Sequence, residues 1–198
     1  MANANTPFGL RPVRHVSGAP YNGAVRAYSM AAGNGTATFI GDPVTLAGTA
    51  QTISGRTYTD VVQAATGDKI VGVIVAVDPV QGTGAGGRDS NIYRLASTQR
   101  VVYVCDDPDA LFEIQEIGTG TPLTANDIGL NVNFSVGSGS TTTGLSGVVV
   151  DNATEATTNT LDLKIVGLVN REDNDVGAYA KWLVRINRHF YANQVAGV

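Results

Sequence analysis

The residues Gly82–Gly87 carry the clearest chemical motif in the chain. Their sequence, GTGAGG, fits the G-x-G-x-x-G spacing of loops that bind dinucleotides. In such loops the third glycine opens a helix, and the N-terminus of that helix binds the pyrophosphate. Here the next residues, RDSNIYRLAS, have the pattern of a strand, and DPVQ separates the preceding apolar strand from the first glycine. We therefore interpret the motif as a loop and expect no cofactor.

Nucleophilic catalysis has few candidate side chains in this sequence. The two histidines, His15 and His189, lie near opposite ends of the chain, and no G-x-S-x-G motif is present to place a catalytic serine. The single cysteine, Cys105, ends the apolar run VVYVC, which is typical of a buried free thiol. Because no acid, base and nucleophile can be combined, we expect that the chain is not an enzyme.

Two acidic clusters have side chains that bind cations in other proteins. Asp173 and Asp175 precede Gly177 with the spacing of part of a calcium loop, but Val184 stands where that loop needs a bidentate acid. The second cluster, residues 106–109, contains three aspartates around a proline that marks a turn. We interpret both clusters as solvated acidic loops and expect no metal site.

Short strand patterns run through most of the chain and predict an all-β fold. Residues 69–77, KIVGVIVAV, are apolar on both faces, which is the pattern of a strand that is covered on both sides. Further strand patterns occupy residues 24–30, 38–46, 91–96, 100–105, 111–117, 147–151 and 160–169. The expected architecture is a small barrel or sandwich of short antiparallel strands.

Two further strands show which side chains face the core. Residues 130–136 alternate between apolar and polar side chains, and the inward set is Leu130, Val132, Phe134 and Val136. Residues 181–191 place three apolar side chains on one face, which we assign to the core: Trp182, Val184 and Ile186.

Only two short segments have helical signals. In residues 124–129 the first residue, Thr124, is a candidate N-cap and the last, Gly129, is a stop signal. Residues 59–67 begin with the cap candidates Thr59 and Asp60 and also end in glycine. We expect neither helix to exceed about two turns.

Composition and charge exclude several classes of protein. The chain of 198 residues has a net charge of −4, so nothing favours nucleic-acid binding, and no apolar run is long enough to span a bilayer. Residues 1–41 contain arginines and no acid, whereas residues 101–198 hold twelve acids and five bases. A basic N-terminal region and an acidic remainder can attract each other, either within one molecule or between neighbours.

The first 23 residues differ from the rest of the sequence. The stretch from Thr6 to Gly23 contains three prolines and has no strand or helix period, yet it includes Phe8 and Tyr21. Proline disfavours an opening strand, and the aromatic residues disfavour a disordered tail. We therefore expect an extended N-terminal arm over residues 1–23 and a β-rich body over residues 24–198 that folds without the arm.

The two ends of the chain resemble the small capsid cement, or decoration, proteins of tailed bacteriophages. The similar segments are NTPFGLRPVRHVSGAPYNG at the start and NREDNDVGAYAKWLVRINRHF near the end. The segments GDKIVGVIVAVDP, VVYVCDDPDALFEIQE and GSGSTTTGLSG extend the resemblance over nearly the whole chain. The resemblance implies a structural protein of the virion, made in the bacterial cytoplasm, that binds the outside of the head and bridges neighbouring major capsid subunits after the shell expands.

The resemblance also implies a homo-oligomer, for which we favour a trimer over a dimer, and an arm that reaches over neighbouring subunits. The expected contact residues are then Phe8, Leu10 and Tyr21 as apolar anchors, with Arg11 and Arg14 meeting acids on the capsid or on a sister subunit. The alternative is a β-sandwich binding module on a virion that recognises carbohydrate or a host surface. Such a module needs an exposed aromatic platform, and the sequence offers a single tryptophan.

Overall fold

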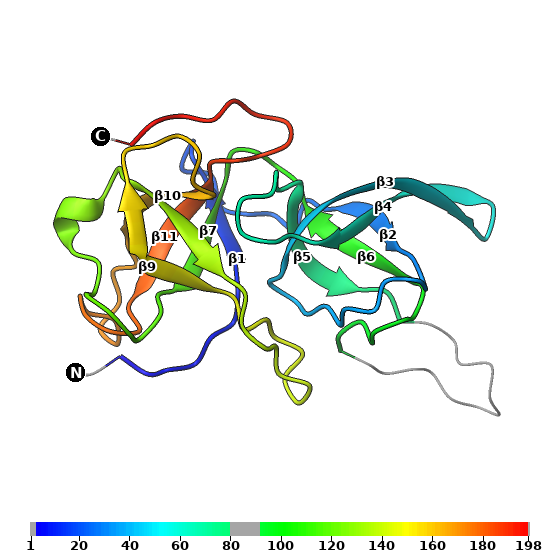
Figure 1. Cartoon of the computed structure of the whole chain (residues 1–198), viewed down its shortest axis with the longest axis horizontal. Coiled ribbons are helices and arrows are strands. Elements are labelled where there is room, and N and C mark those ends of the chain that lie inside the picture. Colours follow the sequence, from blue (N-terminus) through cyan, green and yellow to red (C-terminus); the bar gives the residue numbers. More distant parts are fainter. Residues whose placement is uncertain (1–2, 80–91, 198) are drawn as a thin grey trace.

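The computed structural model describes residues 3–79 and 92–197, so the glycine motif Gly82–Gly87 lies outside the described residues. Within them, regular structure consists of strands and one short 3-10 helix, which confirms the all-β prediction. The strands form two units that lie side by side, a six-stranded sheet and a five-stranded barrel (Figure 1).

The six-stranded sheet has the order β1-β7-β11-β10-β8-β9, and each neighbouring pair is antiparallel. Its strands are β1 (Arg11–His15), β7 (Ala110–Gln115), β8 (Asn131–Ser135), β9 (Val149–Ala156), β10 (Leu163–Leu168) and β11 (Lys181–Ile186). The sheet curls so that the end of β7 meets β9, although the two strands are not neighbours in the sheet order. At this point the backbone N–H of Ile117, just after β7, donates to the carbonyl of Val150 in β9 at 2.9 Å.

The barrel closes in the order β2-β4-β3-β5-β6 and is inserted in the chain between β1 and β7. Its strands are β2 (Arg26–Met30), β3 (Pro43–Ile53), β4 (Arg56–Gln63), β5 (Gly72–Val77) and β6 (Arg100–Cys105). All pairs are antiparallel except β2 and β4, which meet in parallel at Ser29 and Asp60. The chain therefore leaves the sheet after its edge strand, builds the barrel, and returns as the neighbouring strand.

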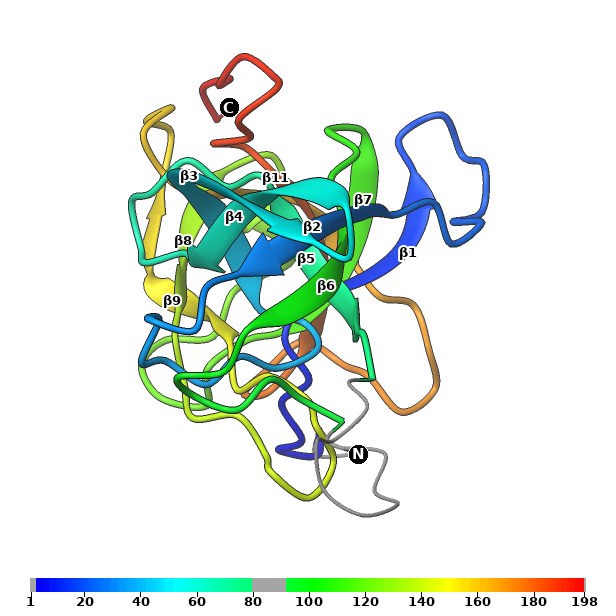
Figure 2. The same ribbon diagram turned by 90° about the vertical axis from the view of Figure 1, so that its right-hand side faces the viewer.

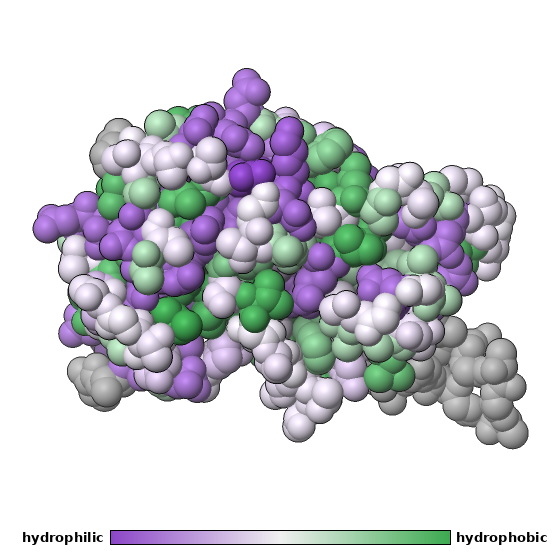
Figure 3. Space-filling model, viewed as in Figure 1, coloured by the Kyte–Doolittle hydropathy of each residue, from purple (hydrophilic) through white to green (hydrophobic). Residues whose placement is uncertain are grey.

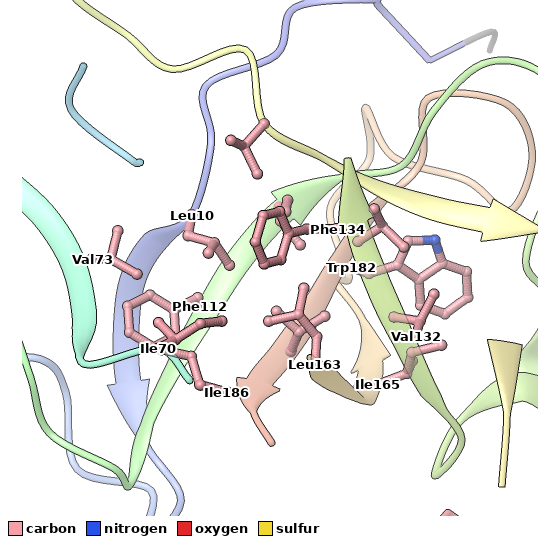
Figure 4. Close-up of a cluster of buried hydrophobic side chains, with 14 of the residues drawn as sticks. Leu10, Ile70, Val73, Phe112, Val132, Phe134, Leu163, Ile165, Trp182 and Ile186 are labelled. Carbon is pink, nitrogen blue, oxygen red and sulfur yellow. The ribbon is translucent and has the colours of Figure 1, made fainter. Parts of the chain in front are cut away.

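Two clusters of buried side chains fill the units. The larger one lies inside the curled sheet and includes Ile70 and Val73 from the barrel side (Figure 4). Cys105, at the end of β6, belongs to the same cluster. The core face predicted for the last strand is confirmed, since the side chains of Trp182, Val184 and Ile186 are buried. The smaller cluster lies within the barrel and consists of Tyr28, Met30, Val44, Val61, Val71, Ile74, Val102 and Val104. The barrel thus has its own cluster and also contributes side chains to the core of the sheet.

The local predictions met different outcomes. The Thr124 cap is confirmed: its side chain accepts from the N–H of Asn126, and a 3-10 helix covers Ala125–Asp127. The helix expected over residues 59–67 is wrong, because residues up to Gln63 continue β4 in pairing with β3. Val132 and Phe134 are buried as expected, whereas Val136 is 42% exposed because β8 ends before it.

Residues Arg11–His15 form a strand of the sheet, which corrects the expectation of an extended arm over residues 1–23. β1 pairs with β7, and it tolerates Pro12 because it lies at the sheet edge (Figure 2). The side chain of Leu10 is 1% exposed and lies among buried side chains that include Phe112 and Phe134 (Figure 4). Residues 10–15 are therefore part of the folded unit rather than of a separate arm.

A close backbone approach fixes the start of this strand. The N–H of Leu10 donates to the carbonyl of Gly41 at 2.9 Å. Gly9 has a φ of 72°, and a Cβ atom there would lie 2.5 Å from the same carbonyl oxygen. Only glycine has both the backbone conformation and the space for this contact, which joins the N-terminal segment to the loop before β3.

Candidate contact surface

The side of the six-stranded sheet that faces away from the core is hollowed. We call it the outer face, and it consists of Val13, Arg14, Leu111, Glu113, Lys164, Val166, Leu168, Leu183 and Arg185. Three adjoining hollows of about 310, 440 and 400 Å³ lie on it, and Arg14 lines all three. Their rims add Ile128 and Val176, which are 41% and 46% exposed. The outer face thus combines an apolar floor with a central arginine.

A bulge in β1 turns Arg14 toward this face. Arg11 is paired with Glu113 and Pro12 with Phe112, but the register then shifts so that Arg14 is opposite Leu111. Strict alternation would place Arg11 and Arg14 on opposite faces of the sheet. The extra residue at Val13 brings both arginines to the outer face, which is a known use of bulges at sheet edges.

Most charged groups on the outer face are already paired within the chain. The carboxylate of Glu113 is buried and accepts from Arg11 at 2.6 Å, and Arg171 lies 2.9 Å from its other oxygen. Arg185 donates to Asp109 at 2.7 Å. The ammonium group of Lys164 donates to the carbonyls of Gly129 and Ala196, and burial together with nearby Arg185 lowers its pKa.

Arg14 differs from these groups. It is exposed, and within the described residues its guanidinium has no hydrogen bond or ion pair. Arginine is the residue type best suited to bind a carboxylate in a fixed geometry, because its guanidinium group can donate two parallel hydrogen bonds. Among the charged side chains of the outer face that the structure describes, Arg14 is therefore the one left free to bind a partner.

The five residues predicted as contacts have separate roles in the structure. Leu10 belongs to the core, which corrects its assignment as an external anchor. Tyr21 is half-buried against that core, and its hydroxyl donates to the carbonyl of Ala24. Phe8 is half-buried, and the guanidinium carbon of Arg11 lies 4.9 Å from its ring centre. Only Arg14 faces open solvent on a hollowed surface.

The acidic segment 106–109 is ion-paired, which corrects its interpretation as a solvated loop. It links β6 of the barrel to β7 of the sheet. Asp106 pairs with Arg26 at 3.1 Å, Asp107 lies 3.1 Å from a ring nitrogen of His15, and Asp109 pairs with Arg185. The predicted attraction between the basic N-terminal region and the acidic remainder thus occurs within one molecule. No local pattern signalled these partners, since they come from three distant strands.

The interior also holds polar groups that the sequence did not single out. Glu116 is fully buried and accepts from the indole N–H of Trp182 at 2.6 Å and from the amide of Asn152 at 3.1 Å. Burial raises the pKa of Glu116, and these hydrogen bonds oppose that rise. Because Trp182 is 0% exposed, it offers no aromatic platform to a carbohydrate.

The remaining candidates for chemistry lie in the interior. Cys105 is a buried free thiol, as predicted, and burial raises its pKa. His189 is buried, and its Nδ1 accepts from the backbone N–H of Tyr191. In residues 3–79 and 92–197, no three His, Cys, Asp or Glu side chains are grouped to hold a metal ion. Over the same ranges no helix is long and apolar enough to cross a membrane.

Figure 3 shows one side of the molecule, on which small hydrophobic areas alternate with hydrophilic ones. Dispersed apolar residues are normal on a protein surface, so this side indicates no second contact surface. No family model, curated protein or solved structure matches the chain. The outer face is therefore the candidate site on structural grounds alone.

Proposed function

We propose that the chain is a capsid cement protein of a tailed bacteriophage, which binds the outside of the head and bridges neighbouring major capsid subunits. In this role it has no catalytic function and stabilises the expanded shell as a homo-oligomer. The resemblance of the sequence to such proteins is the first support. The observation that carries the proposal is the outer face, where Arg14 stands on a hollowed apolar surface without an ion-pair partner among residues 3–79 and 92–197.

The chemistry of the outer face suits a long-lived protein contact. Val166, Ile128 and Val176 are 37–46% exposed and gain from burial against a partner, at about 25 cal/mol for each Å² removed from water. Arginine is among the residues that dominate binding energy at the centre of interfaces. A capsid segment with apolar side chains and one carboxylate would complement both features.

Attachment to heads tests this proposal directly. Expanded heads that lack the protein are mixed with wild type, Arg14→Glu or Lys69→Glu, and occupancy is measured after sedimentation. Lys69 is exposed and lies outside the outer face, so its substitution makes the same change in net charge as the Arg14 substitution. We expect wild type and Lys69→Glu to saturate the heads, and Arg14→Glu to bind at least about tenfold more weakly.

The outcomes separate the parts of the proposal. Failure of the wild type to sediment with heads would reject the cement function. Full occupancy by Arg14→Glu would reject the outer face as the attachment surface. Repeating the assay at low and high salt separates charge from apolar contact, because only the contribution of an exposed ion pair is screened.

A further inference from the structure

The hairpin formed by β3 and β4 extends beyond the barrel (Figure 1). β3 is eleven residues long, but it pairs with β5 only at Pro43 and Val44. Beyond Val44, no strand of the described ranges pairs with the side of β3 that faces away from β4. Residues 47–59 of this hairpin therefore present an open strand edge to solvent.

The turn of the hairpin fixes which backbone groups point outward. Ser54 and Gly55 have φ of 51° and 78°, as in a two-residue type I′ turn. In such a turn the flanking residues, Ile53 and Arg56, bond to each other through their backbone N–H and C=O groups. Because bonded and non-bonded pairs alternate along antiparallel strands, the backbone groups of the next pair do not bond to each other. That next pair is Thr52 with Thr57, whose hydroxyl oxygens lie 3.2 Å apart. By this alternation, the N–H and C=O groups of Thr52, and of Ala50 two residues before it, face away from β4.

A buried carboxylate holds the base of the hairpin. Asp60 is 2% exposed and accepts from Ser29 at 2.6 Å, Thr49 at 2.7 Å and Gln51 at 2.7 Å. Burial favours the neutral acid, but the three hydrogen bonds outweigh it and lower the pKa of Asp60. An isolated two-stranded hairpin is only marginally stable in water, so this clamp keeps the open edge in one orientation. Such preorganisation reduces the entropy lost when the edge binds a partner.

The composition of the edge indicates what it pairs with. Residues 47–59, AGTAQTISGRTYT, contain one charge, Arg56, and no proline. Natural proteins usually protect open edges with lysine, proline or inward-pointing charges. From Ala50 to Ile53 the β3 side lacks all three, and the bulge of β3 lies before Ala50. The β4 side carries Arg56 and pairs with β2 at Asp60. The available edge is thus uncharged and lies on β3.

We propose that β3 pairs antiparallel with β3 of a second copy of this chain. Two identical uncharged edges meet without repulsion, and a twofold axis near Gln51 sets Ala50 in one copy opposite Thr52 in the other. Both residues have outward N–H and C=O groups, so this register satisfies the antiparallel hydrogen-bond pattern. The two hairpins then form one four-stranded sheet. This contact does not depend on capsid binding, and it joins two chains or two larger assemblies.

Paired proline substitutions on the two edges test the proposal in solution. Thr52→Pro removes an outward N–H from β3, and Thr57→Pro removes the matching N–H from β4, with the same proline strain in the same cross-strand pair. Molar mass is measured by sedimentation over a range of concentrations. At high concentration we expect Thr52→Pro to have half the molar mass of wild type, or to associate with a dissociation constant at least about tenfold higher. We expect the molar mass and dissociation constant of Thr57→Pro to match those of wild type.

Lysine variants at the same positions serve if either proline prevents folding, which circular dichroism will reveal. Hydrogen exchange gives a second readout, in which the amides of Ala50 and Thr52 become protected as the concentration of wild type increases. The proposal is wrong if the mass of wild type equals that of folded Thr52→Pro at all concentrations. It is also wrong if the two edges respond equally. Heads are absent from this assay, so its result is independent of the cement function.

Discussion

Replacing Asp162 with asparagine should flatten the dependence of stability on pH. Asp162 lies immediately before β10 and is fully buried. Its carboxylate oxygens accept from the N–H of Gly67 at 3.0 and 3.2 Å. Burial raises the pKa of Asp162 from 3.8 to about 6, although the Gly67 hydrogen bond and the nearby charge of Arg188 act in the opposite direction.

The sign of the effect follows from proton binding. Between pH 3.8 and about 6 the folded chain keeps a proton on Asp162 that the unfolded chain has lost. The free energy of unfolding therefore falls as pH rises through this window. One pKa unit corresponds to about 1.4 kcal/mol, and integration from pH 4.5 to pH 7.0 gives a loss of about 2 kcal/mol from this group.

The assay is urea unfolding of wild type and Asp162→Asn at pH 4.5 and pH 7.0. The stability of wild type should fall between these pH values by about 2 kcal/mol more than that of the variant. A constant cost of the altered hydrogen bond to Gly67 cancels in this double difference. Equal changes in the two proteins would refute the argument that burial of this carboxylate controls its ionisation.

Three further predictions concern stability and local motion. Leu10→Ala should lower the free energy of unfolding by about 2–5 kcal/mol in urea titrations, and a loss below about 1 kcal/mol would mean that the N-terminal segment is dispensable. Trp182→Ala should lower the free energy of unfolding by about 3–5 kcal/mol, and Trp182→Phe by less, because both variants leave Glu116 without its indole donor but phenylalanine fills more of the space. If Trp182→Ala were as stable as wild type, the assignment of Trp182 to the core would be wrong. Asp60→Ala should speed hydrogen exchange across residues 47–59 while the barrel core stays protected, whereas unchanged exchange would show that the hairpin needs no clamp.

Local patterns predicted those parts of the fold that depend on residues close together in the sequence. The alternation around Trp182 identified a buried face, and Thr124 with Gly129 identified a short capped turn, since both depend on neighbours in sequence. The segment 59–67 was misread as helical because the pairing of β4 with β3 overrides a weak cap signal. β1 was not predicted because it contains Pro12, and proline is tolerated in an edge strand but the sequence alone does not show that a strand lies at an edge.

The candidate site was harder to predict for the same reason. Arg11 and Arg14 look alike in the sequence, yet Arg11 pairs with Glu113, whereas Arg14 has no such partner in the part of the chain that the structure describes. Their difference depends on a bulge and on a partner strand about a hundred residues away, which no local pattern encodes. The charge asymmetry did predict attraction between residues 1–41 and residues 101–198, but it left open whether that attraction acts within or between molecules.

The insertion of the barrel between β1 and β7 sets an order of events during synthesis. Arg11 and Glu113, which pair across the two strands, are 102 residues apart. At about 5–20 residues per second, a ribosome needs roughly 5–20 s to make the partner of β1. The barrel strands, from Arg26 to Cys105, are contiguous and all emerge within that interval. β1 therefore waits without its partner strand while the barrel strands emerge, and we expect nascent chains halted before β7 to leave Leu10 without its core contacts to Phe112 and Phe134.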